Sequence, residues 1–221
     1  NKDKTIDDFK LDFKKISASG TLFDLDKMLN ISKNYISRLK ASEVYEASLK
    51  WTEEFDKELY DLLVKYKEYS INLFNIEREQ KKPRKDYSCY SDIKNQIWYM
   101  YDELFDKKED VYKAVEIKDY YASDILFDYI NNYYDDNNTK EQWYEKVKDL
   151  AVKYGFAANV KDYKENPSDY KGHVGDVCEF IRVAITSLTM TPDLYELLKL
   201  LGKNRVYSRI ERFSKHMKSN K

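Results

Sequence analysis

Apolar residues recur at intervals of three and four along most of the chain, the spacing that places them on one face of an α-helix. The pattern is clearest in the last third, which contains three consecutive stripes: Val174, Val177, Ile181, Ile185 and Leu188; Leu194, Leu197, Leu198 and Leu201; and Val206, Ile210, Phe213 and Met217. No long alternation of apolar and polar residues requires a β-sheet. The sequence therefore predicts an all-α fold.

Cap residues bound several of these predicted helices. Thr139 begins a capping box ahead of an apolar helical face, and Gly155 fits the C′ position where that helix ends. Further on, Thr191 and Pro192 fit the N-cap and first position of another helix, because a proline at the first position gives up no intrahelical hydrogen bond. Gly202 fits the end of that helix.

The first half contains two more helical patterns. One runs from Phe55 to about residue 79, and the other follows Ser91, with apolar residues on one face at Ile93, Ile97, Met100, Tyr101 and Leu104. A cluster rich in Asn, Asp and Tyr at residues 131–138 separates helical patterns and marks a boundary. We therefore expect an N-terminal segment (residues 1–40), a first helical domain (residues 41–134) and a second helical domain (residues 135–221).

Composition narrows the class of protein. With 42% hydrophobic and 15% aromatic residues, the 221-residue chain is expected to fold in spite of its 36% charged residues. Its 5 Gly and 3 Pro are few for the many tight turns of a β-sandwich or barrel. No apolar run approaches the ~18 residues that cross a bilayer, so we expect no integral membrane protein and no membrane partner.

Side chains suited to catalysis are scarce. The chain has only two histidines, His173 and His216, which supply a Ser–His–Asp or Cys–His system poorly. A zinc site would have to combine them with Cys89 and Cys178 from distant places, and no Gly-rich phosphate loop is present. We therefore expect no metal and no catalysis by this chain alone.

The net charge of −1 conceals a segregation of charge along the chain. Residues 203–221 hold seven basic residues and one acidic residue, whereas residues 102–145 hold thirteen acidic and five basic residues. A third region is also basic: Arg78, Lys81, Lys82, Arg84 and Lys85. Basic surface of this kind attracts the phosphates of nucleic acids, although it also serves solubility alone.

The terminal helix carries its arginines in one row. Arg205, Arg209 and Arg212 are spaced at i, i+4 and i+7, beside the predicted buried face. Such a row of guanidinium groups is suited to bidentate contacts with phosphates. Tyrosines offer stacking partners for unpaired bases, but core packing is the favoured interpretation for four of them: Tyr87, Tyr90, Tyr99 and Tyr101.

Several sequence blocks together resemble a known family. DYKGHVGD at residues 169–176, IRVAIT at residues 181–186 and TPDLYELLKLLG at residues 191–202 resemble, in this order, the C-terminal end of bacterial glutamyl-tRNA synthetases. FDLDKMLN at residues 23–30 resembles an element of the stem-contact region of that family. IER at residues 76–78 and KPRKD at residues 82–86 resemble parts of its first anticodon-binding helical domain.

The resemblance implies a fold, a partner and a longer parent enzyme. Residues 1–40 would be a residual stem-contact segment, and residues 41–134 and 135–221 two anticodon-binding helical domains, with the glutamate tRNA as partner. The parent enzyme would be a cytoplasmic, monomeric glutamate–tRNA ligase that uses ATP and Mg²⁺. The H-I-G-H-like and K-M-S-K-S-like signatures of its catalytic domain do not occur in this sequence. The resemblance thus implies an inactive tRNA-binding portion that holds no cofactor.

The resemblance also assigns contact residues. The arginine that contacts the anticodon corresponds to Arg182, and further contacts correspond to Thr191, Pro192 and Leu194, while Arg84 is our candidate for reading the third anticodon base. The tRNA backbone would be bound by basic residues of the two basic regions: Arg78, Lys82, Lys85, Arg205, Arg209 and Arg212. Ser187 stands where the family usually has glycine.

Alternatives to these assignments come from the residues themselves. Arg182 is also a candidate for an internal ion pair with an acidic residue, and Thr191 with Pro192 for a helix start and nothing more. The acidic region at residues 102–145 fits a helical protein-interaction scaffold with a basic partner. A synthetase that also accepts the glutamine tRNA would have the same sequence features.

Overall fold

The computed structural model describes residues 10, 12–15, 23–108, 112 and 122–219. Parts of the expected stem-contact segment (residues 1–9, 11 and 16–22) lie outside the described residues, as do residues 109–111, 113–121 and 220–221. Within the described ranges the secondary structure is helical, with one isolated β-bridge between Ala157 and His173. The all-α prediction is therefore confirmed there.

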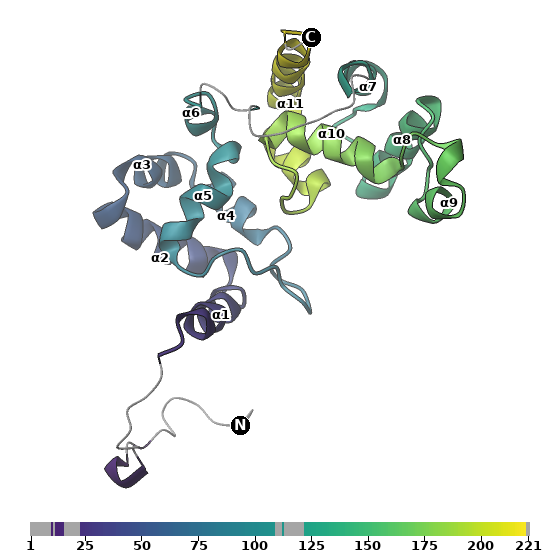
Figure 1. The fold of residues 1–221 in the computed structure, drawn as a ribbon. Coiled ribbons are helices and arrows are strands. Elements are labelled where there is room, and N and C mark those ends of the chain that lie inside the picture. The colour runs from purple at the N-terminus through teal and green to yellow at the C-terminus, as the bar shows by residue number, and fades with distance from the viewer. Residues whose placement is uncertain (1–9, 11, 16–22, 109–111, 113–121, 220–221) are drawn as a thin grey trace.

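Figure 1 shows two groups of helices that meet side by side. The first group follows a short 3₁₀ turn, η2 (Phe13–Lys15), and consists of α1 (Leu25–Ile36), α2 (Ala41–Phe55), α3 (Lys57–Lys65), α4 (Lys67–Asn75), η3 (Tyr90–Asp92), α5 (Ile93–Ile97), η4 (Trp98–Met100) and α6 (Asp102–Phe105). The second group consists of α7 (Ala122–Asp128), the π-helical turn η5 (Tyr129–Tyr133), α8 (Lys140–Lys153), α9 (Val160–Glu165), η6 (Pro167–Asp169), α10 (Val174–Thr186) and α11 (Leu194–Ser219).

Each group buries the apolar faces that the sequence marks. In the first group α2 packs against α3 and α4, and Val44, Leu59 and Leu63 are completely buried. In the second group α10 packs against α11, α8 and α7, with Val177 and Ile181 completely buried. The helix α7 lies before residue 135 but packs against α10 and α11, so the second group begins earlier in the chain than our expected second domain.

Several predicted caps are present. Thr139 forms a reciprocal capping box at the start of α8, and Gly155 follows that helix with φ +82°. The prediction for the start of α11 is wrong by two residues. Asp193 is the cap, because its carboxylate accepts from the Glu196 backbone N–H at 3.1 Å and its carbonyl accepts from the Leu197 N–H at 3.1 Å.

The two long helical patterns of the first half are interrupted. The pattern after Phe55 divides at Tyr66 into α3 and α4 and ends at Asn75, two residues before Glu77, whose φ is +54°. The single helix predicted after Ser91 is divided among η3, α5, η4 and α6, with extended backbone at Tyr101 (φ −110°, ψ 121°). Arginine side chains of α11 donate to main-chain carbonyls next to this second break, those of Tyr99 and Met100.

The two groups meet where α4 and η4 of the first lie against α11 and α10 of the second. Gly202 divides α11 with a non-helical backbone (φ 73°, ψ 162°), so the predicted helix end is confirmed and the chain continues into the terminal helical stretch. Among the described residues, no helix combines the length and the apolar character that crossing a bilayer requires.

Candidate functional site

A pocket of about 460 Å³ lies at the junction of the two groups. Glu77 and Arg84 reach it from the first group, and the remaining lining residues come from α8, α10, residues 191–193 before α11 and the start of α11. The lining includes all five residues that the family resemblance assigns to the anticodon: Arg84, Arg182, Thr191, Pro192 and Leu194. Residues more than a hundred positions apart in sequence are thus brought to one concave surface.

Arg182 extends from α10 beside this pocket. Its Nη1 donates to the Thr189 carbonyl at 3.2 Å, whereas its Nε is buried and has no hydrogen-bond partner among the described residues. Over the same part of the chain, Arg182 makes no ion pair with a carboxylate. The guanidinium therefore lines the pocket without a carboxylate partner from the described part of the chain to neutralise it.

Arg84 lines the same pocket from the first group. Its Nε lies 2.7 and 2.8 Å from the two carboxylate oxygens of Asp86, and its Nη1 lies 3.7 Å from Glu77 Oε2. The side chain remains 34% exposed. The two carboxylates therefore orient Arg84 without enclosing it.

The sequence-based assignment missed three charged residues at the junction, and one of the contacts among them crosses it. Glu77 Oε2 accepts from the Asp193 backbone N–H at 3.1 Å, and Lys140 Nζ lies 2.5 Å from Asp193 Oδ2. Asp193 therefore caps α11 while it is bound by residues of both groups. The positions of Glu77 and Asp193, 116 residues apart, gave no sequence signal for this contact.

Aromatic side chains form another part of the lining. The Trp143 ring lies 5.9 Å from that of Tyr195 and 6.3 Å from that of Tyr144, measured between centroids. Trp143 donates to the Tyr129 hydroxyl and Tyr195 to the Asn138 carbonyl, so both rings are fixed, whereas Tyr144 is exposed. An exposed ring beside fixed ones provides a stacking surface.

The four tyrosines for which core packing was favoured do not supply this surface. Tyr87, Tyr99 and Tyr101 are buried in the core of the first group, as predicted, and Tyr90 is partly buried against it.

Cys178 lies on α10 one turn before Arg182 and also lines the pocket. Burial raises the pKa of its thiol to about 11, with the Arg182 charge acting in the opposite direction. The group is therefore a neutral thiol near pH 7. Cys89, by contrast, is exposed.

The six residues assigned to the tRNA backbone are not alike in exposure. Lys82 and Lys85 are exposed, but Arg78 is only 7% exposed. Arg78 Nε donates to the Phe74 carbonyl at 2.7 Å and its Nη1 to the Ile36 carbonyl at 2.6 Å. Burial lowers the pKa of this guanidinium. In this conformation Arg78 joins the ends of α1 and α4.

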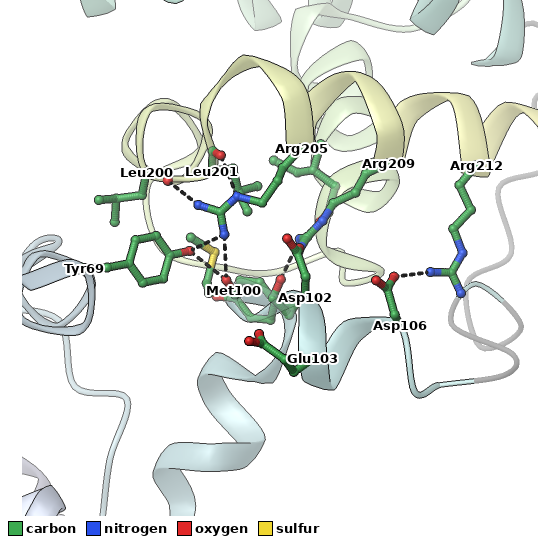
Figure 2. A network of polar contacts seen from close by, with 12 residues as sticks. Tyr69, Met100, Asp102, Glu103, Asp106, Leu200, Leu201, Arg205, Arg209 and Arg212 are labelled. Carbon is green, nitrogen blue, oxygen red and sulfur yellow. Dashed lines mark hydrogen bonds and ion pairs between the residues drawn. The ribbon is translucent and has the colours of Figure 1, made fainter. Parts of the chain in front are cut away.

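The arginine row of α11 points toward η4 and α6 rather than into solvent (Figure 2). Arg205 donates to the Leu200 and Leu201 carbonyls at 2.8 and 2.7 Å and to Met100 O at 3.3 Å. Arg209 is 4% exposed and pairs with Asp102 at 2.6 Å. The carboxylate of Asp106 accepts from Arg212 Nη1 at 2.9 Å.

Comparison with known proteins gives the family. The profile of the family described as "Anticodon binding domain" matches residues 59–214, which include the whole junction pocket. This chain belongs to that family.

The relatives of this anticodon-binding domain are longer proteins. A glutamate–tRNA ligase of Acetivibrio thermocellus is 43% identical over 215 residues, covering 96% of this chain and 38% of the relative. A glutamate–tRNA ligase of Sorangium cellulosum is 36% identical over 213 residues, covering 96% of this chain and 37% of the relative. A glutamate–tRNA ligase of Thermus thermophilus is 25% identical over 209 residues, covering 90% of this chain and 36% of the relative.

These matches confirm the resemblance to bacterial glutamyl-tRNA synthetases. The chain spans somewhat more than a third of the length of the curated relatives it matches.

Proposed function

We propose that this chain is the tRNA-binding, anticodon-recognising portion of a glutamate–tRNA ligase, and that the junction pocket receives the anticodon. The observation that carries the proposal is the convergence of Arg84, Arg182, Thr191, Pro192 and Leu194 on one pocket. Single-stranded anticodon bases are read along their polar edges and stacked on flat side chains. A pocket with two arginines and an aromatic wall offers both kinds of contact.

Within the pocket we assign each residue a role. The guanidinium of Arg182, half-buried in the lining of the pocket, donates to a base edge. Arg84, oriented by Asp86, reads a second base from the opposite group of helices. Pro192, which is partly exposed, supplies the surface on which a splayed base rests, and the buried Thr191 and Leu194 support it from behind.

Phosphate contacts come from the exposed basic residues. We propose Lys82 and Lys85 for this role, because their ammonium groups are exposed beside Arg84 along the chain. The guanidinium groups of Arg78 and Arg209 are engaged inside the protein, so we now propose structural roles for both. Arg205 donates across the junction to Met100 O, so we assign it to joining the two groups. Arg212 pairs with the largely exposed Asp106, and an exposed ion pair contributes little to holding the groups together.

We propose two helical domains that share the anticodon, with residues 1–40 as part of a stem-contact region. The packing of α7 on α10 and α11 supports a second domain that begins near residue 122 rather than 135.

The parent enzyme would form glutamyl-tRNA from ATP, L-glutamate and the glutamate tRNA. We propose that it does so as a cytoplasmic monomer, with ATP and Mg²⁺ bound by residues that this sequence does not contain. No cluster of metal-ligating side chains occurs among the described residues. ATP–pyrophosphate exchange by this chain should be undetectable, and measurable exchange would contradict the assignment.

The decisive test is a binding experiment with Arg182→Ala. Affinity for the glutamate tRNA and for a tRNA that differs only in the anticodon is measured at one low salt concentration. We expect the wild-type chain to prefer the glutamate tRNA and the variant to lose about 1–3 kcal/mol of that preference, the contribution of one good base contact. A uniform loss on both tRNAs would instead make Arg182 a phosphate contact.

Two alternatives have distinct outcomes. A protein-interaction scaffold would purify with a stoichiometric protein partner and without RNA. A portion of a synthetase that accepts both tRNAs would bind the glutamine tRNA as tightly as the glutamate tRNA in a side-by-side measurement.

A further inference from the structure

The guanidinium of Arg209 is buried where the two groups of helices meet. Its Nη1 donates to two main-chain carbonyls, Tyr99 O at 2.5 Å and Ile185 O at 2.7 Å. Tyr99 belongs to η4 of the first group and Ile185 to α10 of the second. One nitrogen atom thus binds both groups of helices.

Each of these carbonyls belongs to a residue that lies near one of the two pocket arginines. Ile185 lies three residues after Arg182 on α10, so a bond at Ile185 fixes the turn that carries Arg182. The Tyr99 side chain lines a small cavity together with Arg84, Asp86 and Pro192. Arg209 therefore binds the turn that carries Arg182 and the backbone of Tyr99, a residue that lines one cavity with Arg84.

The rest of the guanidinium is equally confined. Its Nη2 donates to Asp102 Oδ1 at 2.6 Å, and its Cζ lies 4.0 Å from the centre of the Phe105 ring. The carbonyls of Tyr99 and Met100 lie at the break between η4 and α6, so they have acceptor capacity that an uninterrupted helix would use internally. A planar group with several fixed donors is suited to such a site, and lysine is not an equivalent.

We propose that Arg209 is a positioning residue for anticodon recognition: it sets the separation of Arg84 and Arg182 across the junction without touching the tRNA. The inference rests on the proposed function of the pocket. The spacing of the arginines in the sequence suggests phosphate binding for Arg209, whereas its buried position gives it a role inside the protein.

The test compares Arg209→Met with Arg212→Met in the full chain. Both variants remove one guanidinium from the same row, but that of Arg212 binds a largely exposed Asp106 instead of the two carbonyls. We expect Arg209→Met to lower the preference for the glutamate tRNA over its anticodon variant about tenfold, the scale of one misplaced base contact. Arg212→Met should leave the preference unchanged.

A double-variant cycle separates positioning from a general loss of stability. If Arg209 acts by positioning Arg182, then Arg209→Met should cost much less preference in an Arg182→Ala background than in the wild-type background. Equal costs in both backgrounds would overturn the inference. Absence of any preference in the wild-type chain would instead contradict the proposed function.

A second measurement does not depend on tRNA. Spin labels are placed at the exposed positions Lys85 and Glu179 after Cys89 and Cys178 are replaced by serine, and the distance distribution between them is recorded. We expect a broader distribution in Arg209→Met and in the milder variant Asp102→Asn, and a wild-type distribution in Arg212→Met. A narrow, unshifted distribution in a folded Arg209→Met protein would overturn the proposal.

Discussion

The arginines of this chain differ in what surrounds their guanidinium groups. Arg78 and Arg209 are buried on main-chain carbonyls, whereas Arg84 and Arg182 line an open pocket. Arg78 and Arg84 belong to one basic region, and no local pattern distinguishes them. Arg78 is buried because its guanidinium binds carbonyls that include one from a distant segment, that of Ile36. The sequence therefore predicts the basic region but not which of its members is buried.

Cys178 offers a probe of pocket occupancy at this scale. Its raised pKa, about 11, leaves only about one thiol in a thousand ionised at pH 8, and the thiolate is the reactive form. We expect exposed Cys89 to react quickly with a small maleimide and Cys178 slowly, at a rate that increases up to about pH 11. Mass spectrometry after timed quenching measures both rates.

Bound glutamate tRNA should protect Cys178 further, because this residue lines the pocket with Arg182. Cys89 is the internal control and should react at the same rate with and without tRNA. Unchanged labelling of Cys178 at saturating tRNA would place the bound anticodon elsewhere.

At the scale of helices, cap residues in the sequence correctly predicted those helix starts and ends that depend on hydrogen bonds between neighbouring residues. The capping box at Thr139 and the turn at Gly155 both depend on residues within one helical turn, and both are present. The pattern after Ser91 predicted one helix, but the break around Tyr101 accompanies hydrogen bonds from α11. Such bonds join segments about a hundred residues apart, so helical periodicity does not reveal them.

The residues proposed for the anticodon were identified by resemblance to a family and not by local patterns. Family resemblance gave Arg182, Thr191, Pro192 and Leu194, and these residues lie together in the pocket. The opposing carboxylates were missed because their relevance depends on the packing of two groups of helices. Asp193 was the one member with a local signal, since an aspartate just before a helix is a common cap.

The break in α11 gives a prediction about a single element. Gly202 has φ 73° and ψ 162°, a region that is nearly restricted to glycine, while an added Cβ would meet no atom within 4 Å. We therefore expect Gly202→Ala to lower the free energy of unfolding by about 1–3 kcal/mol through backbone strain alone.

Urea denaturation followed by circular dichroism measures this change. The control is Ser208→Ala, an exposed position on the same helix, where we expect a change within about 0.5 kcal/mol. A Gly202→Ala protein as stable as the wild type would mean that α11 straightens without cost, and that the break does not fix the direction of the arginine row.

For the whole molecule, the acidic region and the basic terminal helix meet in the fold. Asp102 and Asp106 of the acidic region pair with Arg209 and Arg212 of the basic terminal helix. Charges that are separated in sequence therefore partly neutralise one another at the junction. Lys82 and Lys85 lie on either side of the pocket residue Arg84 in the sequence, and both are exposed. They belong to the smaller basic region.

This distribution of charge predicts how binding depends on salt. Each phosphate contact releases counterions, so the slope of log affinity against log salt becomes shallower by about 0.7–0.9 for each contact removed. Lys82→Ala with Lys85→Ala should therefore flatten the slope by about 1.4–1.8 and preserve anticodon preference, since phosphates carry no sequence information. Arg212→Ala should leave the slope unchanged, because Asp106 already neutralises that charge. If Arg212→Ala flattened the slope as much as one lysine substitution, the terminal helix would contact phosphate, and the arginine row would bind tRNA as well as join the two groups.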